Sequence, residues 1–391
     1  MRFRQKTERG NPIVNGPMVV LVMVLIEVGP GLAQEQAPDQ DSPAVPQIDW
    51  NQRLDHSVGR AVHQLLASTS SNDLFIRSNA MEACENLDPL RAMPILQIGI
   101  DDPAVPVRFA AVTTIGKMRM RELLPAARRR LKDTSPHVRA AVIFVLRRCG
   151  EPIDPTPLAS MLTSRDASLR GSVAMLLGMM GDSSAVPMLK NLAQIPLPRT
   201  DNPVSGVLVR IQTAEARVRL GDDSVVNVIR GGLYSNHDEV RVLAAMMLGR
   251  IRDFRMEEAF FELMDNEIDP IELRLAAADA LARMSRTVEV VKEVLENADL
   301  VLTAGQSESP LVRSQTAHTL ASIESARRQS ERYLATLDEI PPRYVGELFL
   351  QDRLSQAIVT LLGDASEKVR LSASAAVFSV VPSQEPDLSV Q

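Results

Sequence analysis

The stretch Asp133-Thr134-Ser135-Pro136-His137-Val138-Arg139-Ala140-Ala141 returns in varied form along this chain of 391 residues. Its arginine has counterparts at equal spacing on either side, Arg108 before it and Arg170 after it, and the series continues in both directions. The arginines of the series are Arg77, Arg108, Arg139, Arg170, Arg210, Arg241, Arg274, Arg313 and Arg370. A recurring spacing of this kind is typical of arrays in which each repeat is one small supersecondary unit.

Each repeat is interpreted as two helices. The first begins after an Asp/Ser/Pro turn that can cap free backbone amides, and it carries the arginine and small residues such as Ala140 and Ala141. A glycine eight or eleven positions after the arginine is expected to end this helix, because glycine tolerates the left-handed conformation. The second helix is expected to have a proline in its first turn, where a missing N–H has no cost. These positions are Gly116, Gly150, Gly178, Gly181, Gly221, Gly249, Pro94, Pro125, Pro157 and Pro187.

The pattern resembles HEAT repeats, and its short period is most similar to the HEAT-like repeats named after phycobilisome lyases. The resemblance implies an all-α fold, a right-handed α-solenoid of stacked antiparallel helix pairs with about eight to nine units. Composition agrees with this expectation, because the chain is 45% hydrophobic but only 3% aromatic. Such a mixture suits thin layers between helices better than a sheet sandwich. The family also implies a role in binding macromolecules.

The N-terminal segment is interpreted as a secretion signal covering residues 1–33. A basic region is followed by an apolar run from Met18 to Ile26 and by a small-residue cleavage site at Gly31-Leu32-Ala33. The apolar run is shorter than the ~20 residues that a membrane span needs. The sequence therefore predicts an exported protein of the bacterial periplasm or the extracellular space. If the signal is not cleaved, it would tether the protein to the inner membrane, facing outward.

The rest of the chain divides by composition. Residues 34–49 are rich in Pro and Gln and are expected to form a flexible linker, residues 50–381 to form the solenoid, and residues 382–391 to form a disordered tail. The two cysteines, Cys84 and Cys149, lie two repeats apart, which is too far for a disulfide between stacked helix layers. Both are therefore expected to be buried, free thiols.

The repeated arginine has two interpretations. An aspartate stands six positions before it in several units, as Asp102 before Arg108, Asp133 before Arg139 and Asp364 before Arg370. This spacing favours an internal ladder, in which the aspartate caps a helix and the arginine bridges to the turn of a neighbouring unit. The functional alternative is that the row of arginines binds an anionic polymer.

Charge is distributed unevenly along the repeats. Between Lys117 and Arg148 the chain has ten basic and two acidic residues, whereas between Asp253 and Asp299 it has thirteen acidic and five basic ones. The hypothesis is that the basic stretch contacts a partner with an acidic surface. The residues proposed for this contact are Arg119, Arg121, Arg128, Arg129, Arg130 and Lys132. Nucleic acid is not an expected partner, because the formal net charge of the whole chain is -6.

No catalytic, cofactor-binding or metal-binding site is predicted. The five histidines are scattered over different units without partners at metal-ligand spacing. Some HEAT-repeat enzymes carry metal on His-Glu dipeptides, and this chain contains none. The favoured function is therefore a non-enzymatic protein-interaction scaffold. The alternatives are a subunit or regulator of an enzyme, similar to the phycobilin lyases, and a structural component that assembles with itself through its charge asymmetry.

Overall fold

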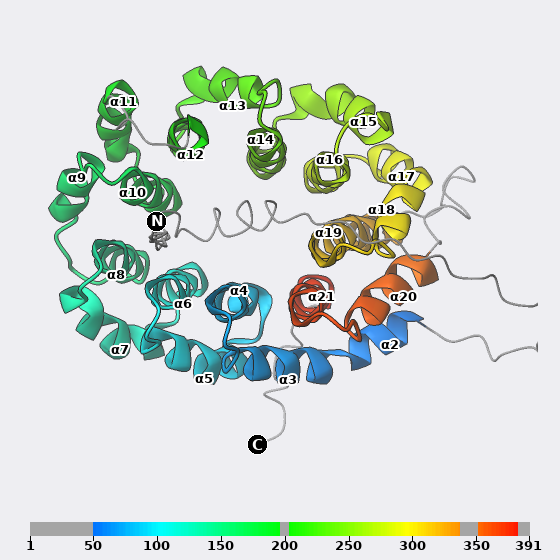
Figure 1. Ribbon diagram of the computed structural model, residues 1–391, viewed down its shortest axis with the longest axis horizontal. Coiled ribbons are helices and arrows are strands. Elements are labelled where there is room, and N and C mark those ends of the chain that lie inside the picture. Colours follow the sequence, from blue (N-terminus) through cyan, green and yellow to red (C-terminus); the bar gives the residue numbers. More distant parts are fainter. Residues whose placement is uncertain (1–49, 196–202, 337–350, 382–391) are drawn as a thin grey trace, which may run out of the picture.

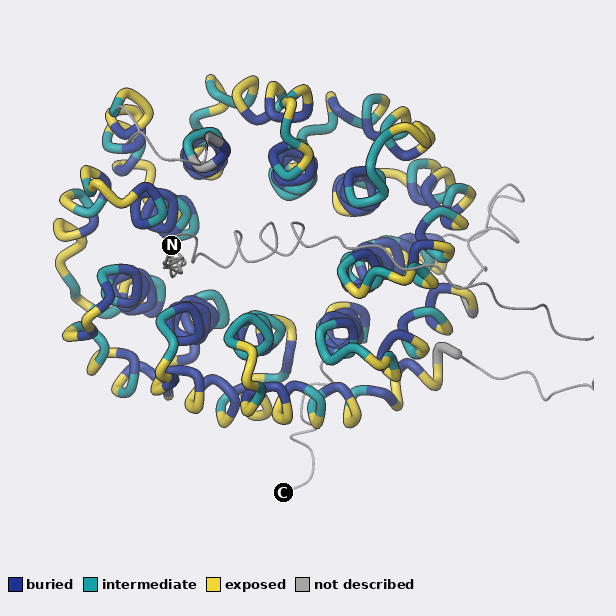
Figure 2. The backbone as a smooth tube through the Cα atoms, viewed as in Figure 1, coloured by how far each residue is buried: buried dark blue, intermediate teal, exposed yellow. Residues whose placement is uncertain are grey.

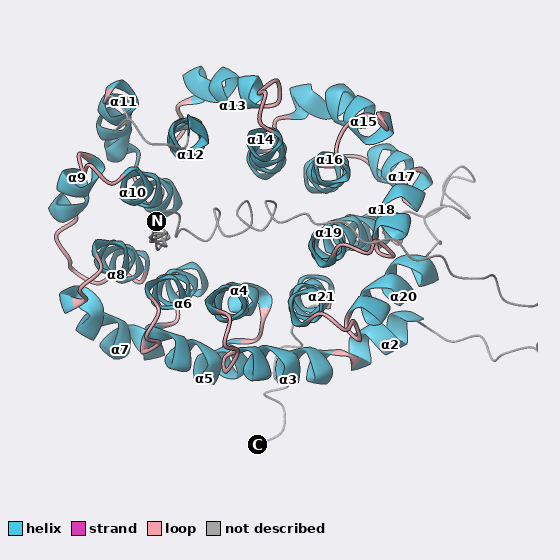
Figure 3. Ribbon diagram, in the orientation of Figure 1, coloured by secondary structure: helices cyan, strands magenta, loops and turns pink. Residues whose placement is uncertain are grey.

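The computed structural model describes residues 50–195, 203–336 and 351–381, and within them it contains helices and no strand (Figure 1, Figure 3). The predicted secretion signal, the linker and the tail lie outside the described residues. The helices are stacked as pairs in two concentric rows, which together form a closed ring. The all-α solenoid predicted from the repeat is therefore confirmed.

The inner row is built from the helices that carry the repeated arginines. It consists of α4 (Leu74–Ala83), α6 (Val105–Met118), α8 (Pro136–Arg148), α10 (Ala167–Met180), α12 (Pro203–Arg219), α14 (Asp238–Ile251), α16 (Ile271–Met284), α19 (Pro310–Leu334) and α21 (Glu367–Val380). Each of the nine arginines lies on its own inner helix, which agrees with the expected eight to nine units. Arginines in the first turns of inner helices pair with aspartates just before the next inner helix, as Arg108 does with Asp133, so the inner helices run in the same direction. Their N-termini therefore form one rim of the ring and their C-termini form the other.

The outer row contains the second helix of each unit. It consists of α3 (Val58–Ser68), α5 (Pro89–Ile100), α7 (Leu124–Arg129), α9 (Thr156–Leu162), α11 (Val186–Gln194), α13 (Val226–Gly232), α15 (Glu257–Asp265), α17 (Val288–Glu296), α18 (Asp299–Ala304) and α20 (Gln351–Leu361), with α2 (Trp50–His56) beside α20. Exposed residues are concentrated on this row, whereas buried residues gather where the two rows meet (Figure 2). The apolar core therefore follows the ring as a continuous band.

The two ends of the solenoid pack against each other. Helix α3 packs more extensively on α21, the last inner helix, than on α4, which follows it in the chain. Hydrogen bonds cross this seam from Ser71 to Glu367 at 3.1 Å and from Asn86 to Ser379 at 2.9 Å. An open solenoid leaves an apolar face at each end that needs a polar cap. Ring closure buries both faces against each other, and the repeat pattern did not predict it.

The small residues after the arginine let the inner helices pack closely. Ala110, Ala111, Ala244 and Ala245 are all at most 1% exposed. Several inner helices begin with the predicted side-chain caps; for example, Asp166 accepts hydrogen bonds from the amides of Ser168 and Leu169. Close packing of alanine-rich helices accounts for the low aromatic content of the chain.

The glycines have two structural roles, and only one of them was predicted from the sequence. Gly150, Gly181 and Gly221, each eleven positions after the arginine, have positive φ and end their helices as expected. The glycines eight positions after the arginine lie inside helices instead. At Gly249, a Cβ atom would be 2.6 Å from the Cα of Ala280, so glycine is needed there for the close approach of two helices. The expectation that these glycines end a helix is therefore wrong.

The prolines also show one difference. Pro125, Pro157 and Pro187 lie in the first turn of their helices, as predicted. Pro94 lies inside α5, which begins earlier, at Pro89, with Asp88 as its cap. The second proline of this helix was mistaken for its start.

Cys84 and Cys149 are buried, free thiols as expected. No helix in the described ranges is both long and apolar enough to cross a membrane.

Candidate functional site

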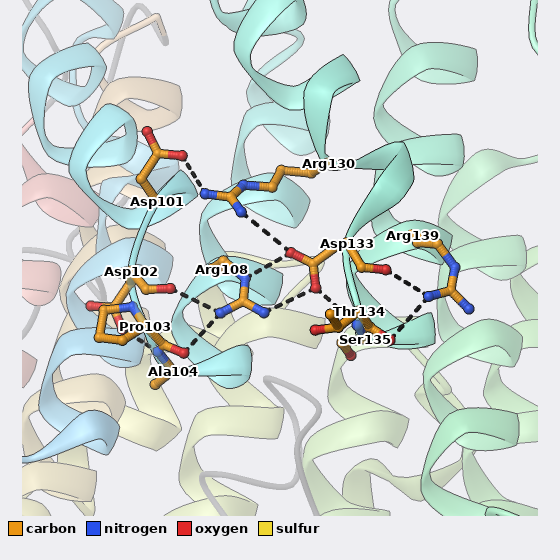
Figure 4. A network of polar contacts seen from close by, with 10 residues as sticks. All are labelled: Asp101, Asp102, Pro103, Ala104, Arg108, Arg130, Asp133, Thr134, Ser135 and Arg139. Carbon is orange, nitrogen blue, oxygen red and sulfur yellow. Dashed lines mark hydrogen bonds and ion pairs between the residues drawn. The ribbon is translucent and has the colours of Figure 1, made fainter.

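The repeated arginines connect neighbouring units along the N-terminal rim (Figure 4). Arg108 donates from Nε and Nη2 to the two carboxylate oxygens of Asp133, both at 2.9 Å, and from Nη1 to the carbonyls of Asp102 and Pro103. Asp133 in turn accepts the amide of Ser135 at the start of α8. Equivalent ion pairs join Arg77 to Asp102, Arg241 to Asp269 and Arg313 to Asp364, at 2.7 to 2.8 Å.

The remaining arginines of the series form other contacts. Arg139 donates to the carbonyls of Asp133 and Thr134, Arg274 donates to the carbonyl of Met264, and Arg210 is exposed. Arg370 donates to Gln64 of the first unit, across the seam. Arg170 is 1% exposed, and its Nε and Nη2 have no hydrogen-bond partner in the described structure. The aspartate-to-arginine contact is therefore present in part of the array and absent around Arg170.

The residues of the basic stretch proposed for partner binding lie in different environments. Arg128 pairs with Glu151 at 2.7 Å, and Arg130 pairs with Asp101 and lies 3.6 Å from Asp133. Arg119, Arg121, Arg129 and Lys132 are exposed. Arg128 and Arg130 are therefore compensated by nearby carboxylates, whereas the other four residues proposed for the contact remain exposed.

A cavity of about 900 Å³ occupies the centre of the ring, and we call it the lumen. Side chains from α4, α6, α8, α10, α12, α14, α16, α19 and α21 line it, so every inner helix contributes to its wall. Binding cavities for small molecules are usually about 300–1,000 Å³. The volume of the lumen is at the upper end of this range, which leaves room for a segment of a larger molecule.

The lumen wall repeats with the sequence. Residues five positions after the repeated arginine form one layer, namely Glu82, Phe144, Met175, Glu215, Met246, Asp279, His318 and Ala375. Residues nine positions after it form a second layer, namely Asn86, Lys117, Arg148, Met179, Arg219, Arg250, Arg283, Ser322 and Ser379. Positions four apart share a face of a helix, so both layers face the same way. Five of the nine residues in the second layer are basic, and we call these five the cation layer.

Carboxylates from other positions partly compensate the cation layer. Lys117 pairs with Glu85 at 2.7 Å and Arg283 with Asp279 at 2.7 Å. Glu215 lies 3.0 Å from Arg219 and 3.5 Å from Arg250. The pKa of Arg283 on α16 is raised mainly by Asp279, and Glu85 on the α4 side of the lumen is near enough to raise it further. Charges from several inner helices therefore form one network at the C-terminal rim.

Two titratable groups of the first layer have shifted pKa values. Burial raises the pKa of Glu82 to about 8, against the opposing effect of Lys117, so this carboxyl is largely protonated at neutral pH. Burial also lowers the pKa of His318, while the nearby Asp279 acts in the opposite direction. Both groups are therefore mainly uncharged at neutral pH, and the cation layer is the dominant charged feature of the lumen.

The sequence analysis missed the lumen residues, although a signal for them was present. The residue nine positions after the arginine is basic in α6, α8, α12, α14 and α16, which aligning the repeats would have shown. The residues that the run between Lys117 and Arg148 suggested for partner binding, such as Arg121 and Arg129, are not among those that line the lumen. Within the described residues, no group of three or more His, Cys, Asp or Glu side chains is arranged to hold a metal ion.

Residues 93–170 match the family model for HEAT repeats. The resemblance predicted from the repeated arginine is therefore confirmed over these residues. No curated protein matches the chain in sequence.

Solved structures with similar folds include the complex of CpcE and CpcF of phycocyanin lyase from Nostoc sp. PCC7120. Its TM-score is 0.41 and its sequence identity is 18%, and the match covers 68% of this chain and 99% of that one. Human deoxyhypusine hydroxylase has a TM-score of 0.33 and 14% identity, covering 70% of this chain and 98% of that one. Kap121p bound to Nup53p has a TM-score of 0.34 and 15% identity, covering 82% of this chain and 42% of that one. The activities and partners in these names belong to those proteins.

Proposed function

We propose that this protein is a non-enzymatic scaffold that holds a segment of a protein partner inside its ring. The observation that carries the proposal is the repeated wall of the lumen, where residues nine positions after every repeated arginine, and five positions after eight of the nine, face one cavity of about 900 Å³. Solenoids commonly bind partners on the surface enclosed by their curvature. In this chain the ends of the solenoid meet, so that surface becomes the inside of a ring.

We also propose that the protein acts outside the cytoplasm, in the periplasm or the extracellular space. The support for this location is the basic region, apolar run and small-residue site within residues 1–33. The exposed members of the basic stretch, Arg119, Arg121, Arg129 and Lys132, are a second contact surface in this proposal, available to an acidic region of the same partner.

The proposal is tested by affinity capture from an envelope extract, with the purified chain as bait and mass spectrometry of the captured proteins. A double variant, Arg148→Glu with Arg250→Glu, places negative charge on the lumen wall, and the matched variant Arg91→Glu alters an exposed residue of the outer helix α5. We expect the lumen variant to lose a protein that the wild type and Arg91→Glu both capture. Equal capture by all three baits would contradict binding in the lumen.

The same purified protein separates this proposal from its alternatives. A phycobilin-lyase-like subunit should bind a bilin and acquire a visible absorbance band, which a scaffold should not. A component that assembles through its charge asymmetry should scatter light strongly at low ionic strength and weakly at high ionic strength, because salt screens exposed charges.

A further inference from the structure

The cation layer surrounds the lumen at one level near the C-terminal rim. It consists of Lys117, Arg148, Arg219, Arg250 and Arg283, from α6, α8, α12, α14 and α16. Cations near the C-terminus of a helix are favoured by its dipole, by about 0.3–1 kcal/mol each. That effect operates on every face of a helix, so it does not explain why these five residues all face the lumen.

Charge in the layer is not fully compensated. Glu85, Glu215 and Asp279 pair with Lys117, Arg219, Arg250 and Arg283. The Nε of Arg148 is buried and has no hydrogen-bond partner in the described structure. Burial lowers the pKa of Arg250 against the opposing attraction of Glu215 and Asp279, and repulsion from the neighbouring cations Arg219 and Arg283 also lowers it. An anion in the lumen would relieve this repulsion, because a cavity lined by charge of one sign attracts the opposite charge.

The wall beside the cation layer is apolar and adaptable on one side. The partly buried Met175, Met179 and Met246 line the lumen on α10 and α14. Methionine is flexible and polarisable, and it is frequent on surfaces that accept varied apolar side chains. An inorganic polyanion would leave these residues without a contact, whereas a peptide with both acidic and apolar side chains would use both parts of the wall.

We propose that the cation layer, together with the adjacent Met175, Met179 and Met246, binds a peptide segment that carries both carboxylates and apolar side chains. This inference rests on the proposed function and specifies the chemistry of the partner. The exposed backbone of such a peptide also finds hydrogen-bonding side chains on the opposite wall, at Gln315, Ser322 and Gln329.

The test is fluorescence anisotropy of labelled twelve-residue probes (about 40 Å when extended) with the full chain. One probe alternates Glu with Leu and Met, a second replaces each Glu by Lys, a third is all Glu, and inorganic polyphosphate serves as a competitor. We expect the Glu/Leu/Met probe to bind at least tenfold more tightly than the Lys probe and the all-Glu probe, and polyphosphate to compete weakly. Equal binding of the all-Glu probe, or strong competition by polyphosphate, would overturn the assignment.

Variants of the chain locate the site. Arg148→Glu should weaken binding of the Glu/Leu/Met probe at least tenfold and Arg148→Met should weaken it less, while Arg91→Glu should leave it unchanged. Met175→Ser should reduce the preference for this probe over the all-Glu probe. Circular dichroism melting identifies any variant that fails to fold, and Arg148→Met, which adds no charge, keeps the test decisive. If Arg148→Glu with Arg250→Glu loses the captured partner but Arg148→Glu leaves binding of the Glu/Leu/Met probe unchanged, the scaffold function stands and this inference fails.

Discussion

Arg108 in one repeat binds both carboxylate oxygens of Asp133 in the next repeat, with Nε–Oδ2 and Nη2–Oδ1 distances of 2.9 Å. The Asp133 side chain is 2% exposed, and it also caps the amide of Ser135. One carboxylate thus connects the inner helix of a unit to the turn that begins the following unit. Burial acts to raise the pKa of Asp133, but the hydrogen bonds from Arg108 and Ser135 outweigh it and hold that pKa below its usual value.

Removing this arginine should destabilise the ring more than removing its neighbour in the series. Arg108→Ala removes both hydrogen bonds to the buried carboxylate of Asp133 and leaves it with the weaker contact to Arg130 at 3.6 Å, so we expect a loss of about 3 kcal/mol in the free energy of unfolding. Arg139 donates only to backbone carbonyls, so Arg139→Ala should cost about 1–2 kcal/mol. Urea unfolding followed by circular dichroism measures both values.

Arg170 provides the opposite case. It is buried without partners for Nε and Nη2 in the described structure, and burial lowers its pKa. The attraction of Asp166 opposes this shift but is smaller than the effect of burial, so replacing Arg170 by an apolar side chain removes a net desolvation penalty. We therefore expect Arg170→Met to leave the chain as stable as the wild type or more stable. A loss of more than about 2 kcal/mol would show that Arg170 has a stabilising partner.

The pKa of Glu82 predicts a dependence of stability on pH. Its folded-state value of about 8 lies above that of an ordinary glutamate, so its contribution to stability is complete below about pH 4.5 and is lost as the pH rises toward 8. Glu82→Gln cannot lose this proton. Relative to the wild type, the free energy of unfolding of the variant should therefore rise by about 2 kcal/mol between pH 5 and pH 9. Water in the lumen screens the carboxylate and keeps the effect to this size. A difference that stays constant with pH would contradict the shifted pKa.

The glycine that lets two inner helices approach should tolerate no side chain. In Gly249→Ala the new Cβ would lie 2.6 Å from the Cα of Ala280, and backbone cannot move aside cheaply, so we expect a loss of about 1–3 kcal/mol. Gly59 on α3 has open space around its Cβ position, so Gly59→Ala should stabilise the helix by about 0.5–1 kcal/mol. Thermal melting of the two variants gives shifts of opposite sign if the packing is as described.

The sequence predicted the helix pairs and their number because each repeat carries its own local signals, such as Asp133 before α8 and Gly150 after it. It did not predict the closed ring, because closure depends on a small change of angle per repeat that accumulates over the array. Contacts between distant residues, such as Asn86 with Ser379, have no local signal. The basic residues nine positions after the arginine are visible in the sequence, but Lys117 and Arg283 face one cavity only because the array closes.

Two arginines occupy positions that favour glycine. Arg119 and Arg252, each eleven positions after a repeated arginine, have φ values of 55° and 54°, where other units have glycine. A left-handed conformation costs a residue with a side chain roughly 1 kcal/mol. Because glycine also makes the unfolded chain more flexible, we expect Arg252→Gly to stabilise the protein by about 0.5 kcal/mol. Arg252→Ala retains the unfavourable φ and should give no such gain in the same melting experiment.

Ring closure can be tested directly with cysteine pairs. Asn86 Nδ2 lies 2.9 Å from Ser379 Oγ, so Asn86→Cys with Ser379→Cys places two thiols side by side although 293 residues separate them. A short bifunctional maleimide should join them and produce a compact, faster-migrating species on a denaturing gel. The control pair Asn86→Cys with Thr134→Cys should not be joined, because Thr134 precedes α8 at the opposite rim. The native Cys84 and Cys149 are buried and should react slowly, which the wild type verifies. If the seam pair reacts no faster than the control pair, the solenoid is open in solution, and the lumen that its closure creates would not exist.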